Sequence, residues 1–395
     1  MGKFITIIFI QVLYGMEMDL FIPSFPELQE IFSLTPVMVQ LTISVNFIAF
    51  CACSLFAGTL GDRFNRRTIL LMGMLIFVLG SVLCVMAPSY TLLIVGRLLQ
   101  GIGISAPAIL SFPILLENCP PQKQPERMAI VNGVKTMAMA IAPVIGSFIN
   151  LYFHWRGNFS LLLGLGGVCL LASYFSIPHK IGNPLVSFSL KSYLPLLKSN
   201  KFRVLQLCLM FLVAALWSFM GMAPIFYIEG MGVPLKSFGY YQGVITFAFA
   251  IMCILSPQIL KRFGQKCCLY FGIGGCIISA ILMLGLIVFQ IHQPKIITAV
   301  IALFSLGCVF PINILYPLSL EVLPNSAGKA AGLGQAIVFL ATALLLELIG
   351  YFYNETFTPI GVAMLIAISL SFILFYRIIK NKWLSFYEEG AIKDR

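Results

Sequence analysis

Charged side chains are scarce in this chain: Asp, Glu, Lys and Arg make up 10% of its 395 residues, against roughly 25% in a typical soluble domain. Hydrophobic residues make up 60%, and no water-soluble fold can bury so large a share, because much of any globule faces solvent. The composition excludes a soluble enzyme and a disordered chain, and it indicates a polytopic membrane protein.

Histidine is scarcer still, with three copies, all near predicted membrane boundaries. The eleven cysteines mostly lie within apolar runs, where Cys acts as a small hydrophobic residue, and their spacing is not that of metal ligands. We therefore expect no metal and no cofactor, and a membrane enzyme with a nucleophile is disfavoured.

Long apolar runs, in contrast, are abundant. A helix needs roughly 20 apolar residues to cross about 30 Å of hydrocarbon, and lipid leaves only helices and closed barrels as spanning structures. Continuous runs differ from the alternation over about ten residues that is typical of a barrel strand. We predict an all-α integral membrane protein with twelve transmembrane helices, at residues 4–24, 38–60, 68–88, 90–114, 129–152, 159–178, 204–228, 238–260, 267–290, 296–320, 329–352 and 358–378.

The basic residues are distributed unevenly between the loops. If the N-terminus is cytoplasmic, 20 of the 25 Lys and Arg residues lie in inner segments and 3 in outer ones. Because cytoplasmic loops carry the excess of Lys and Arg, both termini are predicted to be cytoplasmic. The net charge of +11 is then a topology signal, with membrane lipid as the neighbour of these loops and no nucleic acid as a partner.

A polar, basic segment divides the spans six and six. We predict an N-terminal six-helix bundle at 1–178, a cytoplasmic linker at 179–203, a C-terminal six-helix bundle at 204–378 and a cytoplasmic tail at 379–395. The sequences GDRFNRR after span two and LKRFGQK after span eight place Arg-Phe at the same offset. This weak echo indicates two pseudo-symmetric repeats, an architecture typical of transporters with the site between the halves.

Charges inside a span are expensive, so each requires a reason. Five are identified: Glu17, Asp19, Arg97, Lys135 and Glu347. Asp19 and Arg97 lie at similar depths from the outer ends of spans one and four, so we expect them to pair or to share a water-filled cavity. A nearby guanidinium favours the ionised carboxylate, and its withdrawal favours the protonated form. Asp19 is therefore the candidate that loads and releases a proton.

The other charges have competing interpretations. Glu17 lies about 200° around the helix from Asp19, so both cannot face one cavity; Glu17 either faces a neighbouring helix or shares the coupling role. Lys135 either snorkels to the inner headgroups or belongs to the site. Glu347 is equally an interfacial carboxylate or a functional one.

Three further groups of residues are candidates for function. Uncharged polar residues within the spans have two interpretations: they line a substrate cavity, or they form hydrogen bonds between helices. These residues are Gln11, Tyr14, Asn46 and Asn313. A helix-packing hinge is predicted at Gly101, Gly103, Pro143 and Gly146. The loop at 61–67 is an ordinary basic loop or a latch of the inner gate, with the candidate residues Gly61, Asp62, Arg63, Arg66 and Arg67.

Together these features resemble the major facilitator superfamily. GDRFNRR at 61–67 is similar to its signature loop between spans two and three, and RLLQGIG at 97–103 to the span-four motif whose Arg is tied to proton coupling in drug/proton antiporters. APVIGS at 142–147 resembles the span-five antiporter motif, with Ala142 and Ser147 in place of its usual glycines.

A closer resemblance is to the Bcr/CflA branch of drug-resistance transporters. DLFIPSFP at 19–26, HWRGNF at 154–159 and PNSAGKAAG at 324–332 are similar to its first-span motif, its link between spans five and six and the start of its span eleven. The resemblance implies two six-helix bundles, alternating access and efflux of small apolar or amphipathic compounds such as drugs. It further implies that the proton gradient drives a monomer in the inner membrane of a bacterium, and it favours the latch interpretation of 61–67.

A proton-linked importer of a small metabolite on the same fold is the alternative. The span-five motif favours the exporter, and the direction of proton-driven flux distinguishes the two. The sequence leaves open whether the cargo is an antibiotic, a dipeptide, a sugar or a siderophore.

Overall fold

The computed structural model is all-helical in the part of the chain that it describes, residues 2–117, 119–120, 124–178, 193–322 and 327–384. Ten of the described helices are long and apolar enough to cross a membrane. Most of the predicted linker, the end of the predicted tail, the start of the 324–332 motif and the side chain of Asp62 lie outside the described residues.

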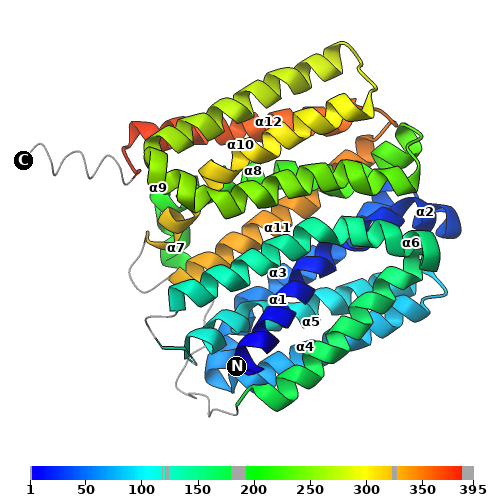
Figure 1. Ribbon diagram of the computed structural model, residues 1–395, viewed down its shortest axis with the longest axis vertical. Coiled ribbons are helices and arrows are strands. Elements are labelled where there is room, and N and C mark those ends of the chain that lie inside the picture. The colour runs from blue at the N-terminus through cyan, green and yellow to red at the C-terminus, as the bar shows by residue number, and fades with distance from the viewer. Residues whose placement is uncertain (1, 118, 121–123, 179–192, 323–326, 385–395) are drawn as a thin grey trace, which may run out of the picture. The chain divides into compact units, whose positions relative to one another are not determined.

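Figure 1 shows the helices in their order along the chain. The first half of the chain contains α1 (Gly2–Asp19), the 3-10 helix η1 (Ile22–Ser24), α2 (Phe25–Phe32), α3 (Pro36–Arg63), α4 (Arg66–Met86), α5 (Tyr90–Glu117) and α6 (Gln124–Ser176). The second half contains α7 (Leu194–Lys198), α8 (Asn200–Pro224), the π-helix η4 (Ile225–Gly230), α9 (Leu235–Val288), α10 (Pro294–Leu320), α11 (Ala327–Phe352) and α12 (Phe357–Lys380).

Two of these helices are about twice as long as a membrane crossing. α6 has 53 residues and α9 has 54, or about 80 Å at 1.5 Å per residue if straight. Each contains one residue outside the helical region, His154 (φ 58°) in α6 and Gly264 (φ 78°) in α9. At the first of these turns the Asn158 side chain donates to the Gly146 carbonyl, 3.3 Å away. At the second, the Cys268 thiol donates to the Ile259 carbonyl at 3.7 Å. Residues so far apart in a straight helix could not meet, so the chain doubles back at both turns. Each helix therefore crosses twice, which confirms the predicted twelve spans.

The first span is interrupted at its outer end, where the chain contains two prolines. α1 ends at Asp19, and the chain continues through η1, which contains Pro23, into α2, where Pro26 lies in the first turn. Proline has no amide hydrogen to donate to a preceding carbonyl. Asp19 consequently lies at the last turn of a helix rather than in its interior.

Contacts between residues divide the chain into two compact units. The first comprises Met1–Ser189 with Ala223–Gly243, and the second comprises Leu190–Met222 with Val244–Arg395. The segment Ala223–Gly243 thus groups with the N-terminal residues, whereas the predicted bundles change at 179–203. The predicted domain boundaries stay a prediction.

The two units contain the same helix-packing arrangement. A Cβ atom on Gly73 of α4 would lie 2.7 Å from the Gly103 carbonyl and 2.9 Å from Pro107 of α5. A Cβ atom on Gly272 of α9 would lie 2.7 Å from both the Gly307 carbonyl and Pro311 of α10. Glycine in these four helices permits backbones to touch.

The loops that predicted the repeat also match. The Arg63 guanidinium lies 5.6 Å from the centroid of the Phe64 ring, and the Arg262 guanidinium lies 5.5 Å from that of Phe263. This equivalence and the glycine contacts support an internal repeat.

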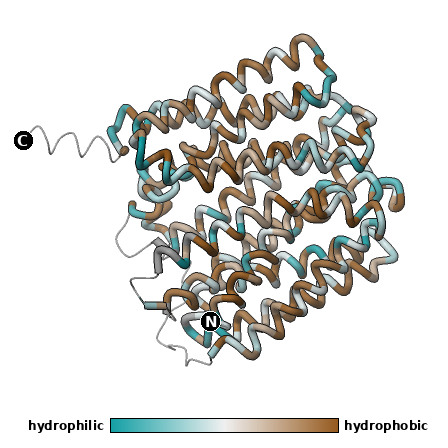
Figure 2. The backbone as a smooth tube through the Cα atoms, in the orientation of Figure 1, coloured by the Kyte–Doolittle hydropathy of each residue, from teal (hydrophilic) through white to brown (hydrophobic). Residues whose placement is uncertain are grey.

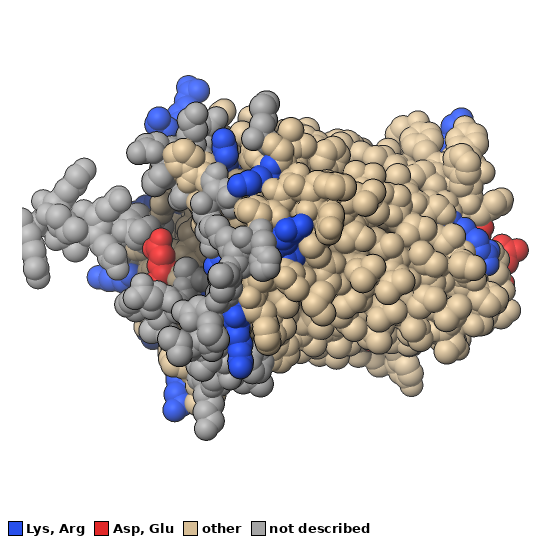
Figure 3. All heavy atoms as spheres, turned by 90° about the horizontal axis from the view of Figure 1, so that it is seen from below, with Lys and Arg blue, Asp and Glu red and all other residues tan. Residues whose placement is uncertain are grey.

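Hydrophobic residues run along the helices, and hydrophilic residues gather mainly at helix ends and connections (Figure 2). On the face shown in Figure 3, the described charged side chains lie toward the helix ends, and the broad surface between them carries none. Most of the basic side chains visible there are at one end. This distribution is typical of helices that cross lipid.

Candidate proton-coupling site

A buried ion pair joins α1 to α5. The Arg97 guanidinium donates through Nη1 to Glu17 Oε1 at 2.8 Å, and both side chains are 0% exposed. Arg97 also lies over the Phe21 ring, 4.1 Å from its centroid. Because the two charges cancel, the pair places no net charge in the membrane interior, which is the condition under which buried charges are tolerated.

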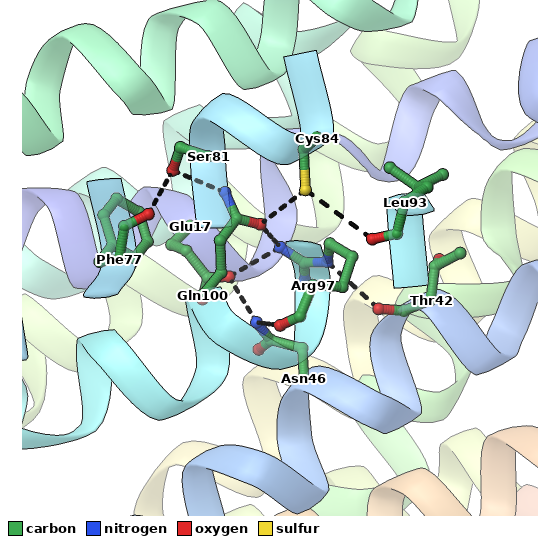
Figure 4. Close-up of polar contacts among 9 residues, drawn as sticks. All are labelled: Glu17, Thr42, Asn46, Phe77, Ser81, Cys84, Leu93, Arg97 and Gln100. Atoms are coloured by element: carbon green, nitrogen blue, oxygen red, sulfur yellow. Dashed lines mark hydrogen bonds and ion pairs between the residues drawn. The ribbon is translucent and has the colours of Figure 1, made fainter. Parts of the chain in front are cut away.

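Side chains from two further helices complete this ion pair (Figure 4). Asn46 of α3 donates to Glu17 Oε1 at 2.9 Å and to the Arg97 carbonyl at 3.1 Å. Arg97 donates to Gln100 Oε1 at 2.7 Å, and Gln100 in turn donates to Ser81 of α4 at 2.9 Å. One network therefore ties α1, α3, α4 and α5 together.

The network corrects the predicted partner of Arg97, which is Glu17 and not Asp19. Glu17 shares one face of α1 with Ile10 and Leu13, and all three are 0% exposed. Asp19, about 200° away around the helix, shares the opposite face with Val12, and both are half-buried. Only one face of α1 can lie against α5, and tertiary packing places the face with Glu17 there.

Asp19 makes no hydrogen bond or ion pair with any other residue that the structure describes. It lies within the apolar segment Gly2–Phe32 and keeps some accessible surface. An acid at this depth without a counter-ion is expensive when ionised. Asp19 is thus the acid of α1 that no described residue neutralises.

The four candidate substrate-cavity residues separate into two kinds. Gln11 and Asn46 are 0% exposed, and Gln11 donates to the Ala108 carbonyl of α5 at 3.0 Å, so both act between helices. Tyr14 and Asn313 are half-buried. Tyr14 stacks on Phe50 at 5.5 Å between ring centroids, and Asn313, in the second unit, donates to Ser256 at 2.7 Å.

The 61–67 loop is anchored within the first unit. Arg67 donates to the Tyr174 carbonyl at 2.6 Å, its backbone amide donates to Asn65 at 2.9 Å, and a Cβ atom on Gly61 would lie 2.6 Å from Leu110. Arg63 is exposed and Arg66 is half-buried. A latch role for this loop stays a prediction.

The predicted hinge residues lie at close helix crossings. A Cβ atom on Gly101 would collide with the Asn46 carbonyl, one on Gly103 with the Phe77 amide, and one on Gly146 with the Leu20 carbonyl. Pro143 is buried within α6. These contacts account for the small residues, and movement at a hinge stays a prediction.

Gln100, Ser81 and Thr42 also belong to the site, although the sequence interpretation did not include them. The Thr42 carbonyl accepts from Arg97 Nε at 3.2 Å. Gln100 follows Arg97 by three residues on the same helix face, which is a signal that the sequence offered. Thr42 takes part through its main-chain carbonyl, which no side-chain pattern indicates. Ser81 is a small polar residue in the apolar helix α4 and carries no such signal.

A sequence model of the Major Facilitator Superfamily matches residues 7–346 of the chain. The chain belongs to the major facilitator superfamily. As a member, it is a multi-pass membrane transporter of small molecules rather than an enzyme.

Two bacterial members of the superfamily are distant relatives. The multidrug resistance protein MdtL of Klebsiella pneumoniae is 25% identical over 250 residues, which are 63% of this chain and 62% of that protein. The chain thus spans less than two thirds of MdtL. A bicyclomycin resistance protein homolog of Haemophilus influenzae is 24% identical over 379 residues, 94% of each chain.

A solved structure of the superfamily has the same fold. The xylose transporter XylE from E. coli, in a partially occluded inward open conformation, matches with a TM-score of 0.74 over 96% of this chain and 97% of that chain. The two sequences are 13% identical, so this similarity concerns the fold alone.

Among the described residues of this superfamily member, no group of three or more His, Cys, Asp or Glu side chains is arranged to hold a metal ion. Glu347 lies half-buried in α11 of the second unit. A functional role of Glu347 stays a prediction.

Proposed function

We propose that this superfamily member exports small apolar or amphipathic compounds, drugs among them, in exchange for protons. The proposed location is the cytoplasmic membrane of a bacterium, and the proposed active form is a monomer. Support comes from the two relatives, whose names are those of drug-resistance proteins, and from the charged residues in the membrane-spanning helices.

The observation that carries the proposal is the contrast between the two acids of α1. Glu17 is neutralised by Arg97 at 2.8 Å, whereas Asp19 has no counter-ion among the described residues and keeps accessible surface. A carboxylate that alternates between two aqueous compartments needs access and must not be held by a permanent partner. Asp19 meets both requirements.

In the proposed cycle, Asp19 takes a proton when the carrier is open to the outside, and the cargo leaves. After reorientation the proton leaves to the cytoplasm and new cargo binds. The Glu17–Arg97 pair is a positioning device, because it holds the helix turn before Asp19 against α3 and α5. The 61–67 loop acts as the latch of one conformation.

The test uses the purified protein in liposomes with its cytoplasmic face outward and an acidic lumen. An exporter of this kind accumulates an amphipathic compound in the lumen as protons leave. We expect Asp19→Asn to reduce gradient-driven accumulation at least tenfold while downhill exchange of the compound continues. Glu30→Gln, the same change at an exposed position of α2, serves as the control.

Undiminished accumulation by Asp19→Asn contradicts the proposed coupling residue. Movement of the compound out of the lumen together with the protons identifies a symporter instead. The direction of flux thereby separates export from the alternative of import on the same fold.

A further inference from the structure

Lys135 lies deep within the first unit. Near the inner end of α1, the Arg127 guanidinium of α6 lies 5.1 Å from the centroid of the Phe4 ring. Further along the same pair of helices, a Cβ atom on Gly15 would lie 2.6 Å from the Lys135 carbonyl. Phe4 and Gly15 are separated by about 16 Å along α1, at 1.5 Å per residue. That distance is about half of the hydrocarbon thickness.

This depth argues against the snorkelling interpretation of Lys135. A lysine snorkels when its side chain reaches the headgroups from near a helix end. Here the side chain points to the middle of α1, because its Nζ atom lies 5.9 Å from the centroid of the Tyr14 ring. The inner end of α1 is marked by Lys3, more than two helical turns before Tyr14.

Within the described ranges of the chain, no carboxylate lies at ion-pair distance from Lys135. Of the two acids of α1, Glu17 is held by Arg97, and Asp19 lies a turn beyond Gly15 without an ion pair to Lys135. An ammonium group at this depth is expensive, and the face of one aromatic ring compensates only part of that cost. The side chain is also half-buried rather than fully enclosed, so a ligand can reach it.

An aromatic surface adjoins the ammonium group. The Tyr14 ring stacks nearly parallel on Phe50 of α3, with 5.5 Å between centroids and 13° between planes. Tyr14, like Lys135, is half-buried. One positive charge beside stacked rings matches a ligand that carries one negative group on an apolar, preferably aromatic, body.

We infer that Lys135 binds the anionic group of an amphipathic substrate, a carboxylate, sulfonate or phosphate ester, while the half-buried Tyr14 ring, backed by the fully buried Phe50, contacts its apolar body. This inference names the substrate class of the transporter proposed above and rests on that function. The ammonium then acquires a counter-charge whenever cargo is bound. Cationic amphiphiles are disfavoured, because they would bring a like charge to Lys135.

The experiment measures binding without a proton gradient, so its outcome is independent of the Asp19→Asn result. The full chain in lipid nanodiscs is titrated calorimetrically with three probes of one shape: naphthalene-2-carboxylate, 2-naphthylmethanol and 2-naphthylmethylammonium. Empty nanodiscs provide the blank. We expect the wild type to prefer the carboxylate over the alcohol by about tenfold or more, the size of one charge-assisted hydrogen bond, and to bind the ammonium most weakly.

Lys135→Met is expected to abolish the preference for the carboxylate and to leave binding of the alcohol unchanged, and Lys135→Arg is expected to retain the preference. Lys295→Met, the same change at an exposed residue of α10 in the second unit, is the matched control. Retention of the preference in Lys135→Met overturns the inference. Equal loss of all three probes also overturns it, since it indicates altered packing rather than charge recognition.

The wild type alone decides the question if Lys135→Met does not fold. A wild-type protein that binds the ammonium probe as tightly as the carboxylate, or does not bind the carboxylate, has no anion site at Lys135.

Discussion

Removing the negative charge of Glu17 should destabilise the protein far more than removing that of Asp19. Glu17→Gln keeps the shape of the side chain but leaves the Arg97 guanidinium, 0% exposed, without an anion. Two unit charges about 4 Å apart interact by about 4 kcal/mol at an effective dielectric constant of about 20. Removal of one partner of a buried pair costs about 3–5 kcal/mol, in agreement with this value.

The assay is thermal unfolding in detergent, followed by the loss of monodisperse protein. A free-energy loss of about 4 kcal/mol lowers the unfolding midpoint by on the order of 10 °C. Asp19→Asn, which removes no hydrogen bond or ion pair seen between described residues, should leave the midpoint within about 2 °C of the wild type.

A second variant separates charge from packing. Glu17→Gln combined with Arg97→Gln removes both charges, so it should recover about 2 kcal/mol or more relative to Glu17→Gln alone. If Glu17→Gln melts like the wild type, or if the double variant is no more stable than the single one, the ion pair does not stabilise this unit and the reasoning fails.

The remaining predictions concern packing and capping. Gly103→Leu would drive a side chain into the Phe77 backbone, so we expect it to lower the stability by about 3 kcal/mol or more and to yield little monodisperse protein. Gly133→Ala, at a position with nothing within 4 Å of an added Cβ, should leave the stability unchanged. A normal yield of Gly103→Leu contradicts the observed packing. Glu27 accepts from the Trp155 backbone amide at 2.9 Å, directly after His154, where the chain of α6 turns back. Glu27→Ala should therefore lower the free energy of unfolding, measured with denaturant, by about 1 kcal/mol. Glu27→Gln keeps an acceptor oxygen and should lower it by less than half of that. Equal losses in the two variants count against a role of Glu27 in capping this helix start.

The spans could be predicted because each segment must by itself be long and apolar enough to cross the hydrocarbon core. A run such as 90–114 is apolar over its whole length and becomes α5, Tyr90–Glu117. The doubled helix α6 was likewise predicted as two spans, at 129–152 and 159–178, because HWRGNF interrupts the apolar run. Pro23 and Pro26 account for the break after α1.

The site was predictable only in part. Helical geometry places Glu17 and Asp19 on different faces, and that inference needs no structure. The choice of which acid meets Arg97 depends on the rotation of α1 against α5, and that rotation follows from packing, for example of Gly101 against Asn46.

By itself, the sequence determined that the protein is an integral membrane protein with twelve crossings. It also predicted which loops face the cytoplasm and identified the charged residues that lie within spans. These properties depend on the composition of single segments. Only the tertiary structure decided which charges cancel and which remain: Glu17 against Arg97, with Asp19 and Lys135 left without ion partners among the described residues. The physical reason is that electrostatic energy depends on distances of a few ångström between helices, and those distances are set by packing rather than by any one segment.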